Sequence, residues 1–171
     1  MRFRRPRPPA EVTQQLERDE RLLAWGRITD GDVVVATPRG LRVPGGRRIG
    51  WHEIDKAAWA DGALTVIEGR ITDDPDFVED QPPQIWTLDE PGTIPNVVRI
   101  RVNRSVAVTE HHDLQPTGGV RIVGRRVSGQ DGLSWFARCD PGTDRRRPEV
   151  REQVAALLAE ARARAEMRGS E

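Results

Sequence analysis

The side chains best suited to chemistry are four consecutive residues whose types bind metal ions or transfer protons: Glu110, His111, His112 and Asp113. A metal-assisted hydrolase would use such a set, with the ion activating a water molecule. Adjacent histidines on a strand point to opposite faces, however, so both reach one ion only where the backbone bends. Catalytic zinc also usually has three protein ligands. The sequence therefore favours an exposed strand end, with the metal site as the alternative.

A second candidate is the stretch GWHEIDKAAW, residues 50–59, which holds a histidine, two carboxylates and a lysine. Zinc proteases place a second histidine four positions after the first, but the residue four positions after His52 is Lys56. The apolar residues suggest another interpretation, because Trp51 and Ile54 have opposite parity in the strand alternation. Such a change indicates a bulge or a short turn. We predict a corner between strands, with Ile54 in the core and the polar side chains outside.

Three further segments resemble binding motifs only in part. Residues 72–83, TDDPDFVEDQPP, are acidic but lack the glycine and the final carboxylate of a helix-loop-helix calcium site. Residues 45–48, GGRR, could cradle a phosphate, but such a loop must open onto a helix and this one joins two strands. Cys139 precedes Asp140, whose charge opposes thiolate formation. These patterns indicate a solvated loop, a turn and an unreactive thiol.

The elements that must position these side chains are mostly strands. Between residues 22 and 90, short segments rich in β-branched and aromatic residues alternate with turn pairs such as Asp30-Gly31, Pro44-Gly45 and Asp61-Gly62. The seven segments are LLAWGRI, DVVVAT, GLRV, RRIGW, KAAWA, ALTVIE and QIWTLD. Strands at this spacing predict a sandwich or a barrel. Because proline cannot donate a backbone hydrogen bond to a neighbouring strand, we expect the acidic segment 72–83 to lie outside the β-sheet.

Helices are expected at three places. The first is a short helix within residues 10–23, AEVTQQLERDERLL. The segment 94–102 fits both a helix and a strand; we favour helix, because Pro95 suits a first turn and Thr93 can cap it. The third begins near Pro148 and has an apolar stripe. The stripe consists of Val150, Val154, Leu157, Leu158, Ala161 and Ala165. Between the last two helices, residues 105–139 predict a three-stranded antiparallel meander.

Composition limits the classes of protein that fit. The 171 residues hold 27 basic and 27 acidic side chains, so the overall basic field of a nucleic-acid-binding domain is absent. A single cysteine rules out an internal disulfide framework and favours the cytoplasm. No apolar run approaches the ~20 residues that span a bilayer, and the first residues do not form a secretory signal. We expect no transmembrane segment and no strong case for nucleic acid.

The expected organisation has three parts. Residues 1–10 form a disordered basic tail with Arg2, Arg4, Arg5 and Arg7; residues 11–104 form the main β domain with its helix; and residues 105–171 form a meander with a long C-terminal helix. The tail offers one alternative function, electrostatic attachment to a membrane or RNA surface.

The order of these signals resembles bacterial pleckstrin-homology-like domains. The segments that carry the resemblance are DERLLAWGRI, VVVATPRGLRV, RRIGWHEIDKA, GALTVIE and IPNVVRIRV. The resemblance implies a β-rich α+β fold: a partly open seven-stranded barrel with one end covered by a helix. The added strands and long helix look like an actinobacterial extension. Eukaryotic relatives grip phosphoinositides through basic residues around the first hairpin, whereas Asp30 and Asp32 stand there in this chain. That departure argues against lipid headgroup recognition.

These observations predict a non-catalytic binding or scaffolding module that acts through protein–protein contacts. We expect no cofactor, an unknown protein partner, and homodimerisation through a strand edge or the C-terminal helix. The expected interaction surface consists of Arg47, Arg48, His52, Leu157 and Leu158. The alternatives are the hydrolase centred on residues 110–113 and the anion-surface adaptor that uses the arginine-rich tail.

Overall fold

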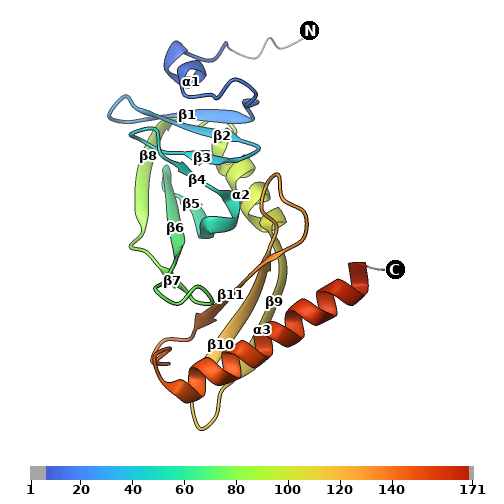
Figure 1. Cartoon of the computed structure of the whole chain (residues 1–171). Coiled ribbons are helices and arrows are strands. Elements are labelled where there is room, and N and C mark those ends of the chain that lie inside the picture. The colour runs from blue at the N-terminus through green and yellow to red at the C-terminus, as the bar shows by residue number, and fades with distance from the viewer. Residues whose placement is uncertain (1–6, 170–171) are drawn as a thin grey trace. The chain divides into compact units, whose positions relative to one another are not determined.

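The computed structural model describes residues 7–169 and divides the chain into two compact units (Figure 1). Unit 1 comprises residues up to Glu68 together with Pro82–Asn103, and unit 2 comprises Gly69–Gln81 and the residues from Arg104 onward. The first three tail arginines, at positions 2, 4 and 5, lie outside the described residues, and Arg7 is exposed. Unit 2 therefore takes the acidic segment 72–81 in addition to the C-terminal part of the chain.

Unit 1 is built from seven antiparallel strands that curl into a half-barrel. They are β1 (Ala24–Ile28), β2 (Val33–Thr37), β3 (Gly40–Arg42), β4 (Arg48–Ile49), β5 (Ile54–Ala60), β6 (Ala63–Ile71) and β8 (Gln84–Glu90). They hydrogen-bond in the order β4-β3-β2-β1-β8-β6-β5. All seven strands were predicted, because residues that favour turns, such as Asp30-Gly31 and Asp61-Gly62, separate the strand segments in the sequence.

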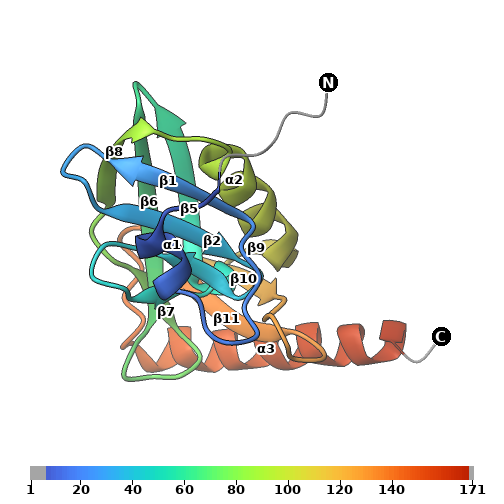
Figure 2. The same cartoon turned by 90° about the horizontal axis from the view of Figure 1, so that it is seen from above.

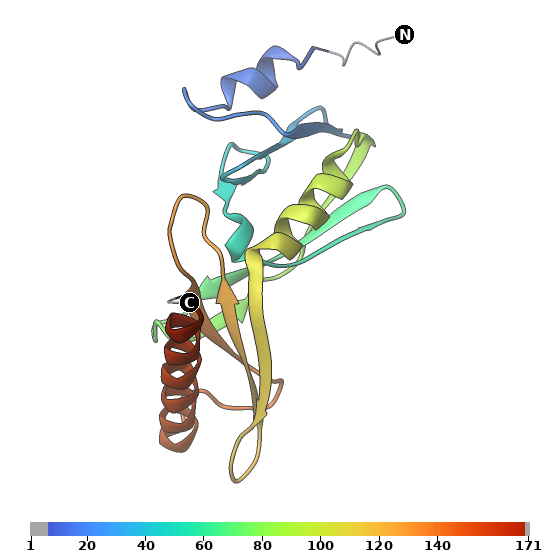
Figure 3. The ribbon, with the colours of Figure 1, turned by 90° about the vertical axis from the view of Figure 1, so that its right-hand side faces the viewer.

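The core of unit 1 lies between these strands and helix α2 (Ile94–Ser105). Ile94, Val98 and Val102 of this helix recur at helical spacing, are buried, and pack against strand residues such as Leu41 and Val66. Figure 3 shows the helix running beside the strands of the unit. The choice of helix for residues 94–102 is confirmed, and the predicted covering helix is present.

The predicted corner in GWHEIDKAAW is confirmed. Trp51–Glu53 form a single 3-10 turn between β4 and β5, and the side chains of Trp51 and Ile54 are buried. The indole Nε1 of Trp51 donates a hydrogen bond to the carbonyl oxygen of Thr37 at 2.9 Å, and Glu53 Oε2 accepts one from the Gly50 amide at 2.7 Å. The carboxylate of Glu53 therefore stabilises the turn that carries it.

The predicted helix over residues 10–23 is only partly correct. Helix α1 spans Ala10–Gln14, and residues beyond it form turns and irregular structure. Val12 packs on Val33 and Val35 of β2, as the top view in Figure 2 shows for the two elements. In the irregular segment that replaces the predicted later turns, Glu17 and Glu20 bind arginine side chains of β3 and β4.

Unit 2 consists of a three-stranded sheet covered on one face by a long helix (Figure 1). The sheet has the order β11-β10-β9, from β9 (Val106–Asp113), β10 (Gly119–Arg125) and β11 (Ser134–Cys139), and the helix is α3 (Pro148–Gly169). Val150, Val154 and Leu158 of α3 are buried against Val120 and Ile122 of β10. The meander and the apolar stripe of the last helix are confirmed.

The acidic segment was wrongly predicted to lie outside every ladder. Strand β7 (Val78–Asp80) pairs antiparallel with Gly69–Ile71 at the end of β6. Phe77 is buried, and the amide of Ala137 donates a hydrogen bond to the Asp76 carbonyl at 2.8 Å. Burial of one aromatic side chain therefore outweighs the prolines and charges around it. Across residues 7–169, no helix combines the length and the apolar run that crossing a bilayer requires.

Candidate functional site

The four residues 110–113 do not converge on one point. Glu110 and His112 lie opposite buried residues of β10 and face α3, whereas His111 faces the other side of the sheet. The guanidinium of Arg164 donates a hydrogen bond to Glu110 Oε2 at 2.6 Å, and His111 Nε2 lies 2.6 Å from Asp140 Oδ2. Within the described part of the chain, no three His, Cys, Asp or Glu residues are grouped to hold a metal ion. Glu110 therefore contacts Arg164 and, at 3.4 Å, His112 on one face of the sheet, whereas His111 contacts Asp140 on the other.

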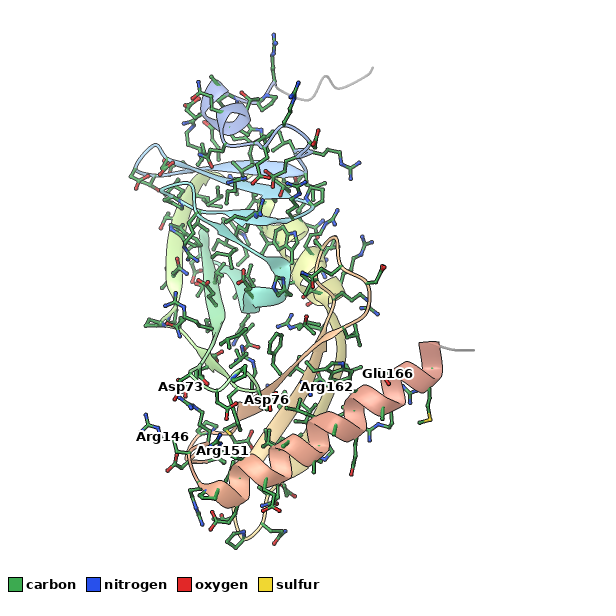
Figure 4. The ribbon with its side chains drawn as sticks, in the orientation of Figure 1. Asp73, Asp76, Arg146, Arg151, Arg162 and Glu166 are labelled. Carbon is green, nitrogen blue, oxygen red and sulfur yellow. The ribbon has the colours of Figure 1, made fainter. Side chains whose placement is uncertain are left out.

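The acidic segment of unit 2 is bound by arginines rather than free in solvent. In Figure 4 its labelled aspartates lie near the arginines of α3. The pairs are Arg138 with Asp80, Arg145 with Asp73 and Glu79, Arg151 with Asp74, and Arg162 with Asp76. The hydrogen bond from Arg145 holds the pKa of Asp73 below its usual value. Most of the carboxylates in these pairs are exposed to solvent, so each pair contributes little to stability; together they join the segment to β11, to the loop before α3 and to α3 itself.

The residues of the predicted interaction surface have varied environments. Arg47 donates two hydrogen bonds to Glu68, at 3.0 and 2.9 Å, and His52 is half-buried in the corner turn. Leu158 is fully buried beneath α3, and Leu157 is half-buried against the same core. The C-terminal helix therefore packs on the sheet of its own chain. Arg48 belongs to a cluster of three arginines, described below.

Unit 1 has a groove of about 650 Å³ beside the start of β1. Its lining comes from the residues before and within β1, from the end of β8 and the turn after it, and from the start of α2. The lining residues are Pro8, Leu22, Leu23, Ala24, Trp25, Glu90, Gly92, Thr93, Asn96 and Val97. Its volume falls within the usual range of ~300–1,000 Å³ for ligand pockets.

The strand pairing explains why a groove forms here. Strand β2 accompanies β1 from Ala24 to Arg27, whereas β8 pairs with β1 only at Arg27 and Ile28. At Glu90 the chain leaves the ladder and turns toward α2, so the beginning of β1 has no strand on that side among residues 7–169. The turn passes close to β1: a Cβ on Gly26 would lie 3.1 Å from the Glu90 carbonyl oxygen. Glycine at position 26 therefore allows the close approach that shapes the groove.

The lining combines an apolar floor with a polar rim. Leu22, Leu23, Trp25 and Val97 are half-buried, so each still presents apolar surface to the groove. Glu90 is exposed at the rim and makes no ion pair with any residue from 7 to 169. An apolar surface with one unneutralised carboxylate suits a ligand that is apolar and carries a positive charge.

The groove was not predicted from the sequence. The predicted strand segments LLAWGRI and QIWTLD include Trp25 correctly, but Leu22 lies before β1, and β8 extends to Glu90, one residue beyond the prediction. Apolar residues at the start of a strand were the only sequence signal, and residues of the core give the same signal. Neither a protein-family model nor a curated protein nor a solved structure matches this chain.

Proposed function

We propose that this protein is a pleckstrin-homology-like binding module that works in the cytoplasm through protein–protein contacts. Its groove beside β1 receives an apolar segment of a partner protein, with a lysine or arginine of that segment placed against Glu90. The single observation that carries the proposal is the groove itself, which joins half-buried Leu22, Trp25 and Val97 to the exposed carboxylate of Glu90, unpaired among residues 7–169. The curled seven-stranded half-barrel with its packed helix supports the relationship to that fold.

The nature of the lining supports a protein partner. The side chains on the floor are half-buried and those on the rim are exposed, which gives an open surface channel and not an enclosed cavity. The start of β1 is also free of strand pairing on the groove side among the described residues, and extended peptides commonly bind beside such strand edges. Apolar anchors supply the affinity in such contacts, and charged rims supply orientation.

The test uses selection from a random peptide library displayed on phage, with the purified full chain as the target. The proposal expects enriched peptides that combine a large apolar residue with a lysine or arginine. Binding of such a peptide should be lost in Asn96→Phe, which fills the groove from an exposed position, and weakened by about 1 kcal/mol or more in Glu90→Lys.

Two variants serve as controls. Glu152→Lys makes the same charge change on the exposed surface of α3, and Ile85→Phe enlarges an exposed apolar residue elsewhere in unit 1. Both are expected to bind the selected peptide like the unaltered protein. Peptides whose binding is insensitive to Asn96→Phe would contradict the proposal, as would a selection dominated by acidic peptides.

A further inference from the structure

Three arginines, Arg39, Arg42 and Arg48, converge in unit 1 on two carboxylates. None of the three lines the groove. Arg42 of β3 and Arg48 of β4 lie directly opposite each other in the antiparallel ladder, and Arg39 lies in the turn that leads into β3. Like charges placed opposite each other in a sheet repel. A register that brings three guanidinium groups together therefore needs an anion among them.

The chain supplies that anion from the segment before β1. Glu17 accepts hydrogen bonds from all three arginines: from Arg42 Nη2 at 3.2 Å, from Arg48 Nη1 at 3.0 Å, and from Arg39 at a shorter distance. Glu20 binds Arg42 at 2.9 Å and approaches Arg48 at 3.5 Å. Two carboxylates thus face three guanidinium groups, which leaves one positive charge in excess.

The two carboxylates differ in how firmly they are held. The Glu20 side chain is fully shielded from solvent and receives a further hydrogen bond from the Thr37 hydroxyl at 2.6 Å. The side chain of Glu17 is 50% exposed, as is much of Arg39, and exposed ion pairs contribute little. Glu20 is therefore a built-in counter-ion, whereas Glu17 occupies an outer position that another anion can take.

We propose that Arg39, Arg42 and Arg48 form a binding site for the phosphate monoester group of a soluble ligand, and that Glu17 occupies this site until the ligand displaces it. A phosphate group fits better than a carboxylate for two reasons. It carries a charge of about −1.5 to −2 at neutral pH and offers three acceptor oxygens, one for each guanidinium.

Glu17 would set the affinity of the site because it competes from within the same chain. An intramolecular competitor acts at a high effective concentration, so removing its charge should expose the full affinity of the arginines. We expect Glu17→Gln to bind inorganic phosphate or phenyl phosphate at least about tenfold more tightly than the unaltered protein. This inference concerns a site that shares no residue with the groove and stands independently of the proposed function.

The experiment is calorimetric titration of the full chain with inorganic phosphate and with phenyl phosphate at low salt. The matched control is Glu11→Gln, which also removes one negative charge but frees a single arginine, Arg27. Adding Arg48→Gln to Glu17→Gln should abolish the gain. The proposal would be overturned if Glu17→Gln and Glu11→Gln bound phosphate with equal affinity. It would also be overturned if the higher phosphate affinity of Glu17→Gln persisted after Arg48→Gln was added.

A second measurement does not depend on the variants being folded. In the unaltered protein, titration with phosphate should shift the side-chain NMR signals of Arg39 and Arg48 and the backbone amide of Glu17, while Arg47, which pairs with Glu68, stays unchanged. If the NMR signals of all exposed arginine side chains shifted to the same extent, phosphate would not be binding at a specific site. Vesicles that contain phosphatidic acid distinguish a lipid source: binding to them without any response to phenyl phosphate would overturn the assignment to a soluble ligand.

Discussion

Glu20 provides a direct test of how unit 1 is held together. Its Oε1 accepts a hydrogen bond from the Thr37 hydroxyl at 2.6 Å, and its Oε2 accepts one from Arg42 at 2.9 Å and one from the Glu17 amide at 3.1 Å. Burial of this carboxyl raises its pKa, but the hydrogen bonds and the charge of Arg42 outweigh that effect and bring the pKa to about 2. In the folded unit the carboxylate is therefore ionised at pH values above about 2.

The contribution of the Glu20 carboxylate to the free energy of unfolding follows from the difference between its pKa in the folded and in the unfolded state. The ordinary value is 4.5, so the folded state favours the ionised form by about 2.5 pKa units, or about 3 kcal/mol. Because the folded pKa is the lower one, this stabilisation is fully present above pH 4.5. It is lost as the pH falls from 4.5 to about 2. Glu20→Gln has no carboxyl to titrate and should lack this part of the pH dependence.

The assay is urea denaturation between pH 7 and pH 2, followed by tryptophan fluorescence. In a Trp135→Phe background, all four remaining tryptophans belong to unit 1, so the signal reports that unit alone. The difference in unfolding free energy between Glu20 and Glu20→Gln should shrink by about 3 kcal/mol across this range, since the other carboxyl groups cancel in the comparison. A difference that stays constant with pH would refute the hydrogen-bonded, ionised state assigned to Glu20.

Three further predictions concern unit 2. Leu158→Ala should destabilise the unit by about 2–5 kcal/mol in urea denaturation, because the side chain is fully buried beneath α3. Gly119→Ala should separate His111 from Asp140, because a Cβ at position 119 would overlap the carboxylate and lie 3.0 Å from the imidazole Nε2; the His111 NMR signals would report the change. Burial raises the pKa of the Cys139 thiol, so iodoacetamide should alkylate it more slowly at pH 8 than free cysteine, as measured by mass spectrometry.

Features that depend on neighbouring residues could be predicted from the sequence. The seven strands of unit 1 follow from alternation and turn pairs, and the corner at Ile54 follows from a change of parity within a few positions. The apolar stripe of α3 likewise identified the buried residues of that helix, Val154 among them. In each case the signal that sets the structure lies within the segment itself.

Features that depend on distant partners were missed. Strand β7 forms because Phe77 is buried near Ala137, which is 60 positions away in the sequence. Beyond the short helix α1, Glu17 binds arginines that arrive with β3 and β4. The groove exists because β8 leaves β1 at Glu90, and no local pattern states where two strands will part. Local sequence patterns thus predict the helices and strands, whereas the groove and the arginine cluster depend on contacts between residues that are distant in the sequence.

The central claim is that the groove beside β1 binds an apolar, positively charged segment of a protein partner. Its most direct test is an NMR titration of the full chain with a peptide selected from the library. The account predicts that the largest shifts fall on Leu22, Trp25, Thr93 and Val97, and that Asn96→Phe abolishes them. Shifts confined to unit 2, or shifts that persist unchanged in Asn96→Phe, would contradict it.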